Sequence, residues 1–460
     1  MFLKKKNHFH FVGICGIGMS GIATVLKKMG YQVSGSDISS NYISKKLSEI
    51  GVKIFFNHKK SNIKNSDVVV ISSAIPKNNI EIVTANSLKI PVILRAKLLS
   101  ELMNSKQFNI TVAGTHGKTT TTSMIIDIFL KNKLDPTFIN GGVLKTINKS
   151  CHYGFGKHFI AEADESDASF LYLKPNLSVV TNIGSDHIMT YKNSIRKMKF
   201  SFLKFLNNLS DPGTVILCLD DYIARSILKK INKKVLTYGF NDNSNFRITK
   251  YKQNKEIISF IITKKNKNII KCKIKYPGRH NALNATAAII TSLEIGLSKN
   301  DILKSLKKFS GVKRRFEIFK RISFENKENI TIIDDYGHHP KEIGCTISTV
   351  MKWKKRIVLI FQPHRYTRIK CFYEDFIKVL EKVDVLFIMD IYPAWENPLD
   401  GINSLSLFNS IYKRKKMKKV FLVNEKNMKK ILSYVLREND LILIQGAGNV
   451  SEVVRNIFGI

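Results

Sequence analysis

The sequence lacks long hydrophobic runs and paired cysteines. No stretch of about 18 or more uncharged apolar residues is present, so we expect no transmembrane segment. The basic residues 1–6 are followed by neither a long apolar stretch nor a small-residue cleavage site, so we expect no signal peptide. None of the six cysteines forms a Cys-x-x-Cys pair, which argues against a zinc site or a disulfide framework and favours a cytoplasmic protein with reduced thiols.

Negative charge is also scarce. The 460 residues include 36 acidic and 75 basic side chains, which gives a formal net charge of +39. Such an excess is found in nucleic-acid-binding proteins, and a basic protein that binds nucleic acid is one alternative. Lysine is spread along the whole chain, however, and no nucleic-acid-binding motif is present. We therefore predict no nucleic-acid partner and expect the positive field to favour anionic substrates such as nucleotides.

A glycine turn between a short apolar run and a helical pattern is the strongest chemical signal. The apolar run is 108–113, and residues 124–129 repeat apolar side chains at helical spacing. In such a turn backbone N–H groups bind phosphate oxygens, a lysine reaches the outer phosphates and a threonine hydroxyl binds Mg²⁺. An ordinary strand-to-helix turn is the alternative, since Val112 stands where the general P-loop pattern has its first glycine. The residues predicted to bind ATP here are Gly114, Thr115, His116, Gly117, Lys118, Thr119 and Thr120.

A second glycine turn lies near the start of the chain. Gly16-x-Gly18-x-x-Gly21 separates a predicted strand at 8–12 from a predicted helix at 19–29, and Asp37 directly follows a strand at 32–36. This arrangement is typical of a nucleotide-diphosphate site, in which the acid binds a ribose hydroxyl. Close packing of the helix is the alternative, because it also requires small residues. Further strands at 68–72 and 91–94 complete a βαβ rhythm with a parallel sheet.

The rest of the chain continues the α/β pattern without an internal repeat or a low-complexity linker. A second unit contains a predicted strand at 178–181, a β-meander at 241–275 and an Ala-rich helix after residues 276–284. A third unit begins near residues 311–316, with strands predicted at 330–334, 357–362, 383–390, 419–423 and 440–445. The length also favours about three domains, and we predict their bounds as 1–106, 107–312 and 313–460.

Polar side chains follow the strands of the second unit. Glu162 begins an acidic run that ends at residue 167, and His187 ends the segment 181–187. With Thr119 they would hold one or two Mg²⁺ ions beside the γ-phosphate, because Mg²⁺ is usually bound by one or two carboxylates and by phosphates. A solvated loop carboxylate and a helix-capping or core histidine are the alternatives for Glu162 and His187.

Two polar runs follow strands of the third unit, where open α/β sheets bind ligands. Residues 334–340 contain two Asp, a Tyr and two His, and residues 362–368 contain Arg365 and Arg368. The two arginines could hold a carboxylate in bidentate fashion, although a basic surface turn would look the same. Residues 313–315 are all basic and could reach phosphates, but basic residues are common in this chain.

These motifs resemble those of the Mur ligase family of ATP-dependent amide-bond ligases over nearly the whole chain. The resemblance rests on residues 13–21, 114–120, 162–167, 277–284, 311–316, 334–340, 361–368, 392–394 and 445–449. The shortened turn at Gly114 belongs to the family pattern, and His116 and the run 334–340 point to its alanine-adding branch. The resemblance implies an α/β fold of three domains: a Rossmann-like N-terminal domain, a central P-loop α/β domain that binds ATP and a Rossmann-like C-terminal domain.

The resemblance also implies substrates, cofactors and site residues. The substrates are UDP-N-acetylmuramate and L-alanine, the cofactors are ATP and Mg²⁺, and we expect a monomer or weak homodimer with no membrane insertion. The implied catalytic residues are Lys118, His187 and Glu162, and the implied Mg²⁺ ligands are Thr119, Glu162 and His187. Further ATP contacts are implied for Asn281, Asn284, Arg315 and Asp335, UDP-sugar contacts for Gly16, Gly18, Asp37 and Ser73, and amino-acid contacts for Tyr336, His364, Arg365 and Arg368.

The chain departs from the family pattern at three positions. Gly184 and Met189 stand where acids are expected, and Trp395 stands where glycine is expected. Lys197 or Lys199 could occupy the place of a lysine that several sister ligases carry in carbamylated form. The nearest alternative is a sister ligase that reattaches a recycled tripeptide to the same sugar nucleotide. A ligase that adds glutamate to folate fits less well, because the N-terminal glycine-turn domain suits a UDP-sugar.

Overall fold

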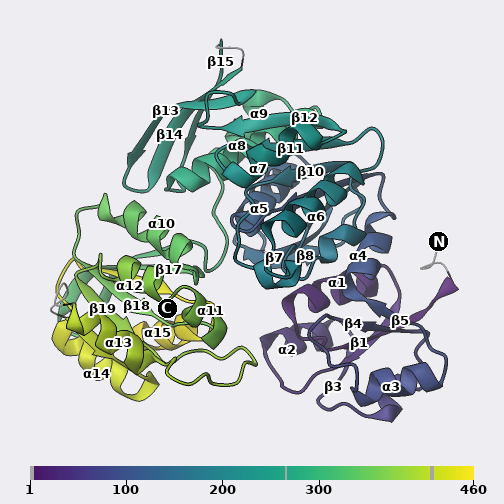
Figure 1. The fold of residues 1–460 in the computed structure, drawn as a ribbon, viewed down its shortest axis with the longest axis horizontal. Coiled ribbons are helices and arrows are strands. Elements are labelled where there is room, and N and C mark those ends of the chain that lie inside the picture. The colour runs from purple at the N-terminus through teal and green to yellow at the C-terminus, as the bar shows by residue number, and fades with distance from the viewer. Residues whose placement is uncertain (1–4, 265–266, 415–418) are drawn as a thin grey trace. The chain divides into compact units, whose positions relative to one another are not determined.

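The computed structural model describes residues 5–264, 267–414 and 419–460. Its strands form three sheets, of five, ten and six strands, which follow one another along the chain (Figure 1). The chain divides into two compact units. The first holds the chain up to Tyr251 with Ser259–Ile274 and Asn281–Ser310, and the second holds Lys252–Ile258, Lys275–His280 and the chain from Gly311 onward.

The first sheet is parallel, with the strand order β3-β2-β1-β4-β5. Its strands are β1 His8–Val12, β2 Gln32–Ser36, β3 Lys53–Phe55, β4 Val68–Ile71 and β5 Val92–Leu94. Its helices are α1 Ile17–Lys28, α2 Tyr42–Glu49, α3 Ile80–Ser87 and α4 Arg95–Met103, with the 3-10 turn η2 Lys60–Ile63. Because side chains alternate along a strand, Phe9 and Phe11 pack with α1 and α4, whereas Val12 packs with η2 and α3 on the other face.

The second sheet has the order β15-β14-β13-β12-β11-β10-β6-β9-β7-β8. Its strands are β6 Phe108–Ala113, β7 Thr137–Leu144, β8 Lys149–His152, β9 His158–Glu162, β10 Leu177–Val180, β11 Thr214–Cys218, β12 Lys234–Gly239, β13 Phe246–Asn254, β14 Ile257–Lys264 and β15 Lys267–Ile274. Its helices are α5 Lys118–Lys131, α6 Ile195–Asn207, α7 Tyr222–Ile227, α8 Arg279–Glu294 and α9 Lys299–Lys307, with the short turns η3 Ser169–Tyr172, η4 Ile188–Tyr191 and η5 Leu228–Lys230. The predicted meander is confirmed, because β13, β14 and β15 are successive neighbours in the sheet.

The third sheet has the order β16-β17-β21-β18-β19-β20. Its strands are β16 Glu317–Phe324, β17 Lys327–Asp335, β18 Ile357–Phe361, β19 Val385–Ile388, β20 Val420–Leu422 and β21 Leu441–Gln445. Its helices are α10 Pro340–Met351, α11 Tyr366–Cys371, α12 Tyr373–Leu380, α13 Ser404–Lys413, α14 Glu425–Val435 and α15 Val450–Phe458. Helices α10, α12 and α13 cover one face and α14 and α15 the other, which gives the α/β layers expected of a Rossmann-like domain.

The third glycine of the N-terminal motif serves packing between two sheets of the first unit. A Cβ atom at Gly21, in α1, would lie 3.0 Å from Ile139 Cγ2, in β7. The packing alternative for this glycine is therefore realised, against a neighbouring sheet and not within the βαβ unit. All six cysteines carry free thiols, as the spacing predicts. Among the described helices, none has the length and hydropathy of a membrane-spanning segment.

Candidate active site

The predicted strand, turn and helix of the phosphate-binding motif are present. Strand β6 ends at Ala113 and helix α5 begins at Lys118, so the turn between them is residues 114–117. Gly114 and Gly117 have φ values of +126° and +83°, a backbone conformation that residues other than glycine rarely adopt. A Cβ atom at Gly117 would also lie 2.7 Å from Asn284 Oδ1. The turn therefore requires both glycines, and it brings Asn284 of α8 beside the start of α5, as the predicted ATP site demands.

The loop after β10 holds this turn in shape. Asn182 accepts the His116 N–H at Oδ1 (2.9 Å) and donates from Nδ2 to the His116 carbonyl (2.8 Å). Thr181 Oγ1 donates to the same carbonyl (2.6 Å), and Gly184 N–H donates to Thr115 Oγ1 (2.7 Å). Sequence reasoning did not single out Asn182, although its place directly after a buried parallel strand is where such a contact arises.

Lys118 is folded back over the turn. Its Nζ donates to the Gly114 carbonyl (2.7 Å) and to Glu165 Oε2 (2.7 Å). Burial lowers the pKa of Lys118, but the carboxylates of Glu165 and Asp164 outweigh burial, and the net direction is a raised pKa. The lysine is therefore a cation held at the place where the turn would present phosphate oxygens. Glu165 was not predicted as a site residue, although it lies in the acidic run that begins at Glu162.

The donor set beside the turn suits Mg²⁺ in part. Glu162 ends β9, which is paired with β6, and its Oε1 accepts the Gly141 N–H (2.6 Å). Glu165 Oε1 is buried without a hydrogen-bond partner among the described residues, as an oxygen that faces a cation would be. Thr119 is buried in the first turn of α5. These carboxylate and hydroxyl oxygens fit the preference of Mg²⁺, whereas His187, at the start of η4, offers a nitrogen, which Mg²⁺ uses less.

The departures near His187 have different surroundings. Gly184 donates its N–H to Thr115 and so helps to hold the phosphate-binding turn. Met189 is 69% exposed. Asp186, next to His187, lies 3.0 Å from His116 through Oδ2 and Nε2, so one acid of the expected pattern contacts the turn. Lys199 Nζ lies 5.7 Å from the centre of the Tyr222 ring, a cation–π contact of α6 with α7.

Residues predicted to contact the UDP-sugar gather at the carboxyl ends of β1, β2 and β4. Gly16 is the N-cap of α1, and a Cβ atom at Gly18 would lie 3.2 Å from Arg95 Nη1. Asp37 follows β2, and its Oδ2 accepts the Cys15 N–H (2.9 Å), so this acid ties the glycine turn to β2. Ser73 follows β4, and its Oγ donates to Asp167 Oδ2 (2.9 Å).

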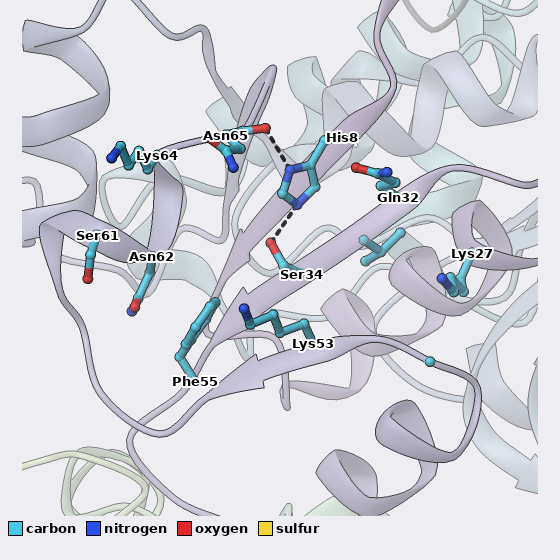
Figure 2. A pocket seen from close by; sticks show the side chains of 12 residues that line it. His8, Lys27, Gln32, Ser34, Lys53, Phe55, Ser61, Asn62, Lys64 and Asn65 are labelled. Atoms are coloured by element: carbon cyan, nitrogen blue, oxygen red, sulfur yellow. Dashed lines mark hydrogen bonds between the residues drawn. The ribbon is translucent and has the colours of Figure 1, made fainter.

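A pocket of about 290 Å³ lies elsewhere in the same domain (Figure 2). His8, Gln32 and Lys53 line it and are the first residues of β1, β2 and β3. The pocket therefore reaches the amino-terminal ends of these strands, whereas the glycine turn lies at their carboxyl ends. None of the predicted UDP-sugar residues lines the pocket.

In the compact unit that holds the third sheet, three of the predicted amino-acid-binding residues lie in one row of rings and guanidinium groups. Ring centroids are 5.4 Å apart between Tyr336 and His338, 5.4 Å between His338 and His364, and 5.5 Å in the stacked pair His364–Tyr392. Arg368 Nη1 donates to His364 Nδ1 (3.1 Å). His338 and Tyr392 were not predicted individually, although both belong to runs that carry the family resemblance.

The two histidines of this row are neutral. Burial lowers the pKa of His338 to about 4 and that of His364 to about 3, and Arg368 adds to both shifts. A row of neutral rings with a guanidinium fixed beside His364 suits a ligand that carries a carboxylate and an amine.

Arg365, the fourth residue predicted to bind the amino acid, contacts Glu396 instead of the row. Its φ is +68°, and its Nε lies 3.9 Å from Glu396 Oε1. Glu396 also accepts the Thr367 N–H at 3.0 Å, so Arg365 belongs to the contact between α11 and the loop after β19. Trp395, in that loop, has a φ of +71° and is 86% exposed. The glycine that the family pattern expects at this position thus has a conformational reason.

Asp335, predicted near ATP, is engaged by its own domain. Its Oδ2 accepts the Phe316 N–H (2.9 Å) and its Oδ1 accepts the Gly337 N–H (3.0 Å). Burial raises the pKa of Asp335, and these N–H groups and Arg315 act in the opposite direction. Asp335 therefore fixes the positions of Arg315 and Tyr336, whose ring centroid lies 5.0 Å from the Arg315 guanidinium.

Comparison with protein families gives matches along most of the chain. Residues 8–107 match "Mur ligase family, catalytic domain", residues 112–292 match "Mur ligase middle domain" and residues 314–448 match "Mur ligase, glutamate ligase domain". The three matches agree with the three sheets and with the three-domain α/β fold expected from the sequence.

Individual proteins agree with these matches. UDP-N-acetylmuramate–L-alanine ligase of Wigglesworthia glossinidia brevipalpis is 48% identical over 460 residues, which cover 98% of this chain and 97% of the relative. The crystal structure of UDP-N-acetylmuramate-alanine ligase from Thermotoga maritima superposes with a TM-score of 0.84 at 29% identity and covers 98% of both chains. A murein peptide ligase from Psychrobacter arcticus superposes with a TM-score of 0.72 at 20% identity and covers 98% of both chains, which shows a shared fold.

Proposed function

Because this chain belongs to the Mur ligase family, we propose that it is an ATP-dependent ligase that joins L-alanine to the carboxylate of UDP-N-acetylmuramate in peptidoglycan precursor synthesis. The observation that carries this proposal is the coincidence of two facts. The relative that is 48% identical over nearly the full chain is named for this activity. The chain also has the turn 114–117 with Lys118 held above it, which such a ligase needs for ATP.

The reaction has two chemical steps. The muramic acid carboxylate attacks the γ-phosphate of ATP, which gives an acyl phosphate and ADP. The amine of L-alanine then attacks the acyl carbon, and phosphate leaves through a tetrahedral intermediate. Lys118 stabilises the negative charge that develops on the transferred phosphoryl group, because its ammonium already lies over the phosphate-binding turn.

Mg²⁺ would add charge neutralisation and orientation of the phosphates. We assign its binding to Thr119, Glu162 and His187, with Glu162 oriented by the Gly141 N–H. The remaining ATP contacts of this proposal are Gly114, Thr115, His116, Gly117, Thr120, Asn281, Asn284, Arg315 and Asp335, of which Asp335 acts through the backbone that it holds.

L-Alanine would bind along the row that begins at Tyr336. Arg368 supplies the cation for the alanine carboxylate, and His364 fixes that guanidinium through Nδ1. Arg365 would contribute to this site by holding the loop after β19 through Glu396. UDP-N-acetylmuramate would bind at Gly16, Gly18, Asp37 and Ser73. The proposal includes the domain bounds 1–106, 107–312 and 313–460, a cytoplasmic location and a monomer or weak homodimer.

Discrimination between two amino-acid substrates tests the proposal. Phosphate release would be measured with ATP, Mg²⁺ and UDP-N-acetylmuramate, and with either L-alanine or the tripeptide L-alanyl-γ-D-glutamyl-meso-diaminopimelate. Release that depends on L-alanine is expected. Release with the tripeptide alone would instead assign the chain to the recycling branch of the family.

A further inference from the structure

The pocket of Figure 2 contains none of the residues that the proposed function uses. Its volume of about 290 Å³ is close to that of the smaller small-molecule sites in proteins. Among its 12 lining residues only Val33 and Phe55 carry apolar side chains. The pocket is therefore a polar cavity and not a gap in the packing of the core.

The charged side chains of this pocket are basic. Lys27, Lys53 and Lys64 line it, and no Asp or Glu does. Within residues 5–264, 267–414 and 419–460 none of these three lysines forms an ion pair, whereas Lys131 and Lys234 each contact a carboxylate. A concave site lined by charges of one sign focuses the electric field, so this pocket attracts anions.

Two of the three lysines are held at the wall of the pocket. Lys53 Nζ lies 5.2 Å from the centre of the Phe55 ring, in a cation–π contact. Lys27 lies over Gly51, where an added Cβ atom would be 3.5 Å from Lys27 Cε and 3.7 Å from Nζ. Lys64 directly follows η2. Because these contacts already restrict Lys27 and Lys53, an anion that binds them has less side-chain freedom to remove.

The polar floor of the pocket is also fixed in place. Ser34 is 4% exposed and Asn62 is 8% exposed, yet both line the pocket. Ser34 Oγ lies 2.8 Å from His8 Nε2. Asn62 Nδ2 donates to Glu81 Oε1 (2.6 Å) and to the Asn57 carbonyl (2.9 Å). These hydrogen bonds hold the floor in one arrangement before any ligand binds.

A phosphate group fits this chemistry better than a carboxylate or a metal ion. Ammonium groups repel metal cations, and three of them exceed the single charge of a carboxylate. A phosphate group carries up to about two negative charges and three acceptor oxygens, and lysine binds such groups as a point charge. A nucleic-acid strand fits less well, because it requires an extended groove that follows the backbone and this pocket is small.

We propose that this pocket binds a small anion that carries one or more phosphate groups, with Lys27, Lys53 and Lys64 as its cationic contacts. The inference goes beyond the proposed function, because none of these residues is assigned to ATP, to the sugar nucleotide or to the amino acid. It also stands without that function, since it needs only the geometry and charge of the first domain.

Calorimetric titration of the full-length wild-type protein with inorganic pyrophosphate tests the proposal. Excess ADP and UDP-N-acetylmuramate are present, so that the two proposed nucleotide sites are occupied. We expect pyrophosphate to bind at one site. Lys53→Ala is expected to weaken this affinity about tenfold or more, because a hydrogen bond to a charged group contributes that much.

Lys60→Ala is the matched control. Lys60 is an exposed lysine of η2 that does not line the pocket, so its substitution removes the same charge from the same domain. We expect its affinity for pyrophosphate to equal that of the wild type. Thermal melting would establish that both variants fold.

Two further probes distinguish the sources of the phosphate group. Glucose 1-phosphate and inorganic phosphate each carry one phosphate group, so tighter binding of the sugar phosphate would identify an ester as the occupant. Tighter binding of pyrophosphate than of glucose 1-phosphate would identify a diphosphate. Either result supports the proposal when the affinity falls in Lys53→Ala.

The proposal fails if the wild type binds none of the three probes, or if Lys53→Ala binds them as tightly as the wild type. Equal losses in Lys53→Ala and Lys60→Ala would also overturn it, because they would reflect only the general field of a chain with a net charge of +39. A single-stranded oligonucleotide that binds more tightly than pyrophosphate and is weakened by both substitutions would replace it with a nucleic-acid surface.

Discussion

Lys118 Nζ lies 2.7 Å from Glu165 Oε2; the carboxylate is almost completely removed from solvent, and the lysine side chain is 16% exposed. The pair keeps the lysine charged and directed at the turn 114–117 without a nucleotide. Binding of ATP phosphates would give the ammonium a second set of anionic partners. Glu165 is therefore a structural requirement of the phosphate-binding turn, even though it need not touch the nucleotide.

Glu165→Gln should destabilise the first unit. The substitution leaves a half-buried ammonium without its carboxylate, a change that costs up to about 3 kcal/mol, the value for fully buried pairs. We expect a lower free energy of unfolding in urea and a higher KM for ATP. Asp242→Asn is the control, because it breaks an ion pair with Arg247 in which both side chains are exposed, and it should change neither quantity measurably. Equal stability of the two variants would contradict this role of Glu165.

Gly117→Ala and Gly296→Ala form a matched pair. Both glycines have positive φ, +83° and +92°, so each substitution should cost about 1 kcal/mol in backbone strain. Only at Gly117 would the added Cβ meet a neighbour, Asn284 Oδ1, since nothing lies within 4 Å at Gly296. We expect both variants to lose stability, and only Gly117→Ala to raise the KM for ATP. A normal KM in Gly117→Ala would disprove the steric requirement of the turn.

Trp395→Gly should stabilise the protein. The tryptophan is highly exposed at a φ of +71°, so its removal relieves strain of about 1–2 kcal/mol, offset in part by the greater freedom of glycine in the unfolded chain. A rise of the melting temperature is expected by calorimetry. Tyr434→Gly, an exposed aromatic in α14, should lower it, because glycine disfavours helix. A change of the same sign in both variants would argue against the strain.

Stability should depend on pH through His338. Its pKa is about 4 in the folded protein, against about 6.5 in an unfolded chain. The unfolded chain therefore binds the proton first, so the contribution is complete above pH 6.5 and is lost as the pH falls toward 4. Between pH 7.5 and 5.5 the wild-type protein should lose about 1 kcal/mol more than His338→Asn, whose amide can still donate to the Tyr336 carbonyl. Parallel pH profiles in urea denaturation would show that His338 titrates normally.

Chelation should stop turnover. We expect EDTA to abolish phosphate release and excess Mg²⁺ to restore it. Glu162→Gln should raise the Mg²⁺ concentration for half-maximal rate about tenfold, because it removes one anionic ligand. Glu294→Gln is the control, since that carboxylate of the same unit pairs with Lys234 instead. An unchanged Mg²⁺ requirement in Glu162→Gln would remove Glu162 from the metal site.

The strands that bear the site were predictable to within a residue or two from periodicity. The residues 8–12, 32–36 and 108–113 match β1, β2 and β6, because buried parallel strands are short apolar runs between glycine turns. The edge strand β16 was not predicted. Its polar face alternates irregularly, and its pairing with β17 contains register shifts, so no clear period remains in the sequence.

The site was predictable where chemistry and chain order coincide, as at Gly117 and Lys118. The site was less predictable where a residue that contacts it comes from a part of the chain distant in sequence. Asn182 and Glu165 hold the turn from other elements of the sheet, and only the folded register brings them there. Asp37 and Asp335 were expected to face ligands, yet both also accept N–H groups of neighbouring turns, a contact that sequence spacing does not reveal.

The most direct test of the account is phosphate release from ATP and Mg²⁺ by the wild-type protein and by Lys118→Ala, with each co-substrate supplied alone and together. Release that requires both UDP-N-acetylmuramate and L-alanine, and that falls by a factor of about 10² or more in the variant, is the predicted result. Release without a sugar nucleotide, or release that survives in Lys118→Ala, would contradict it.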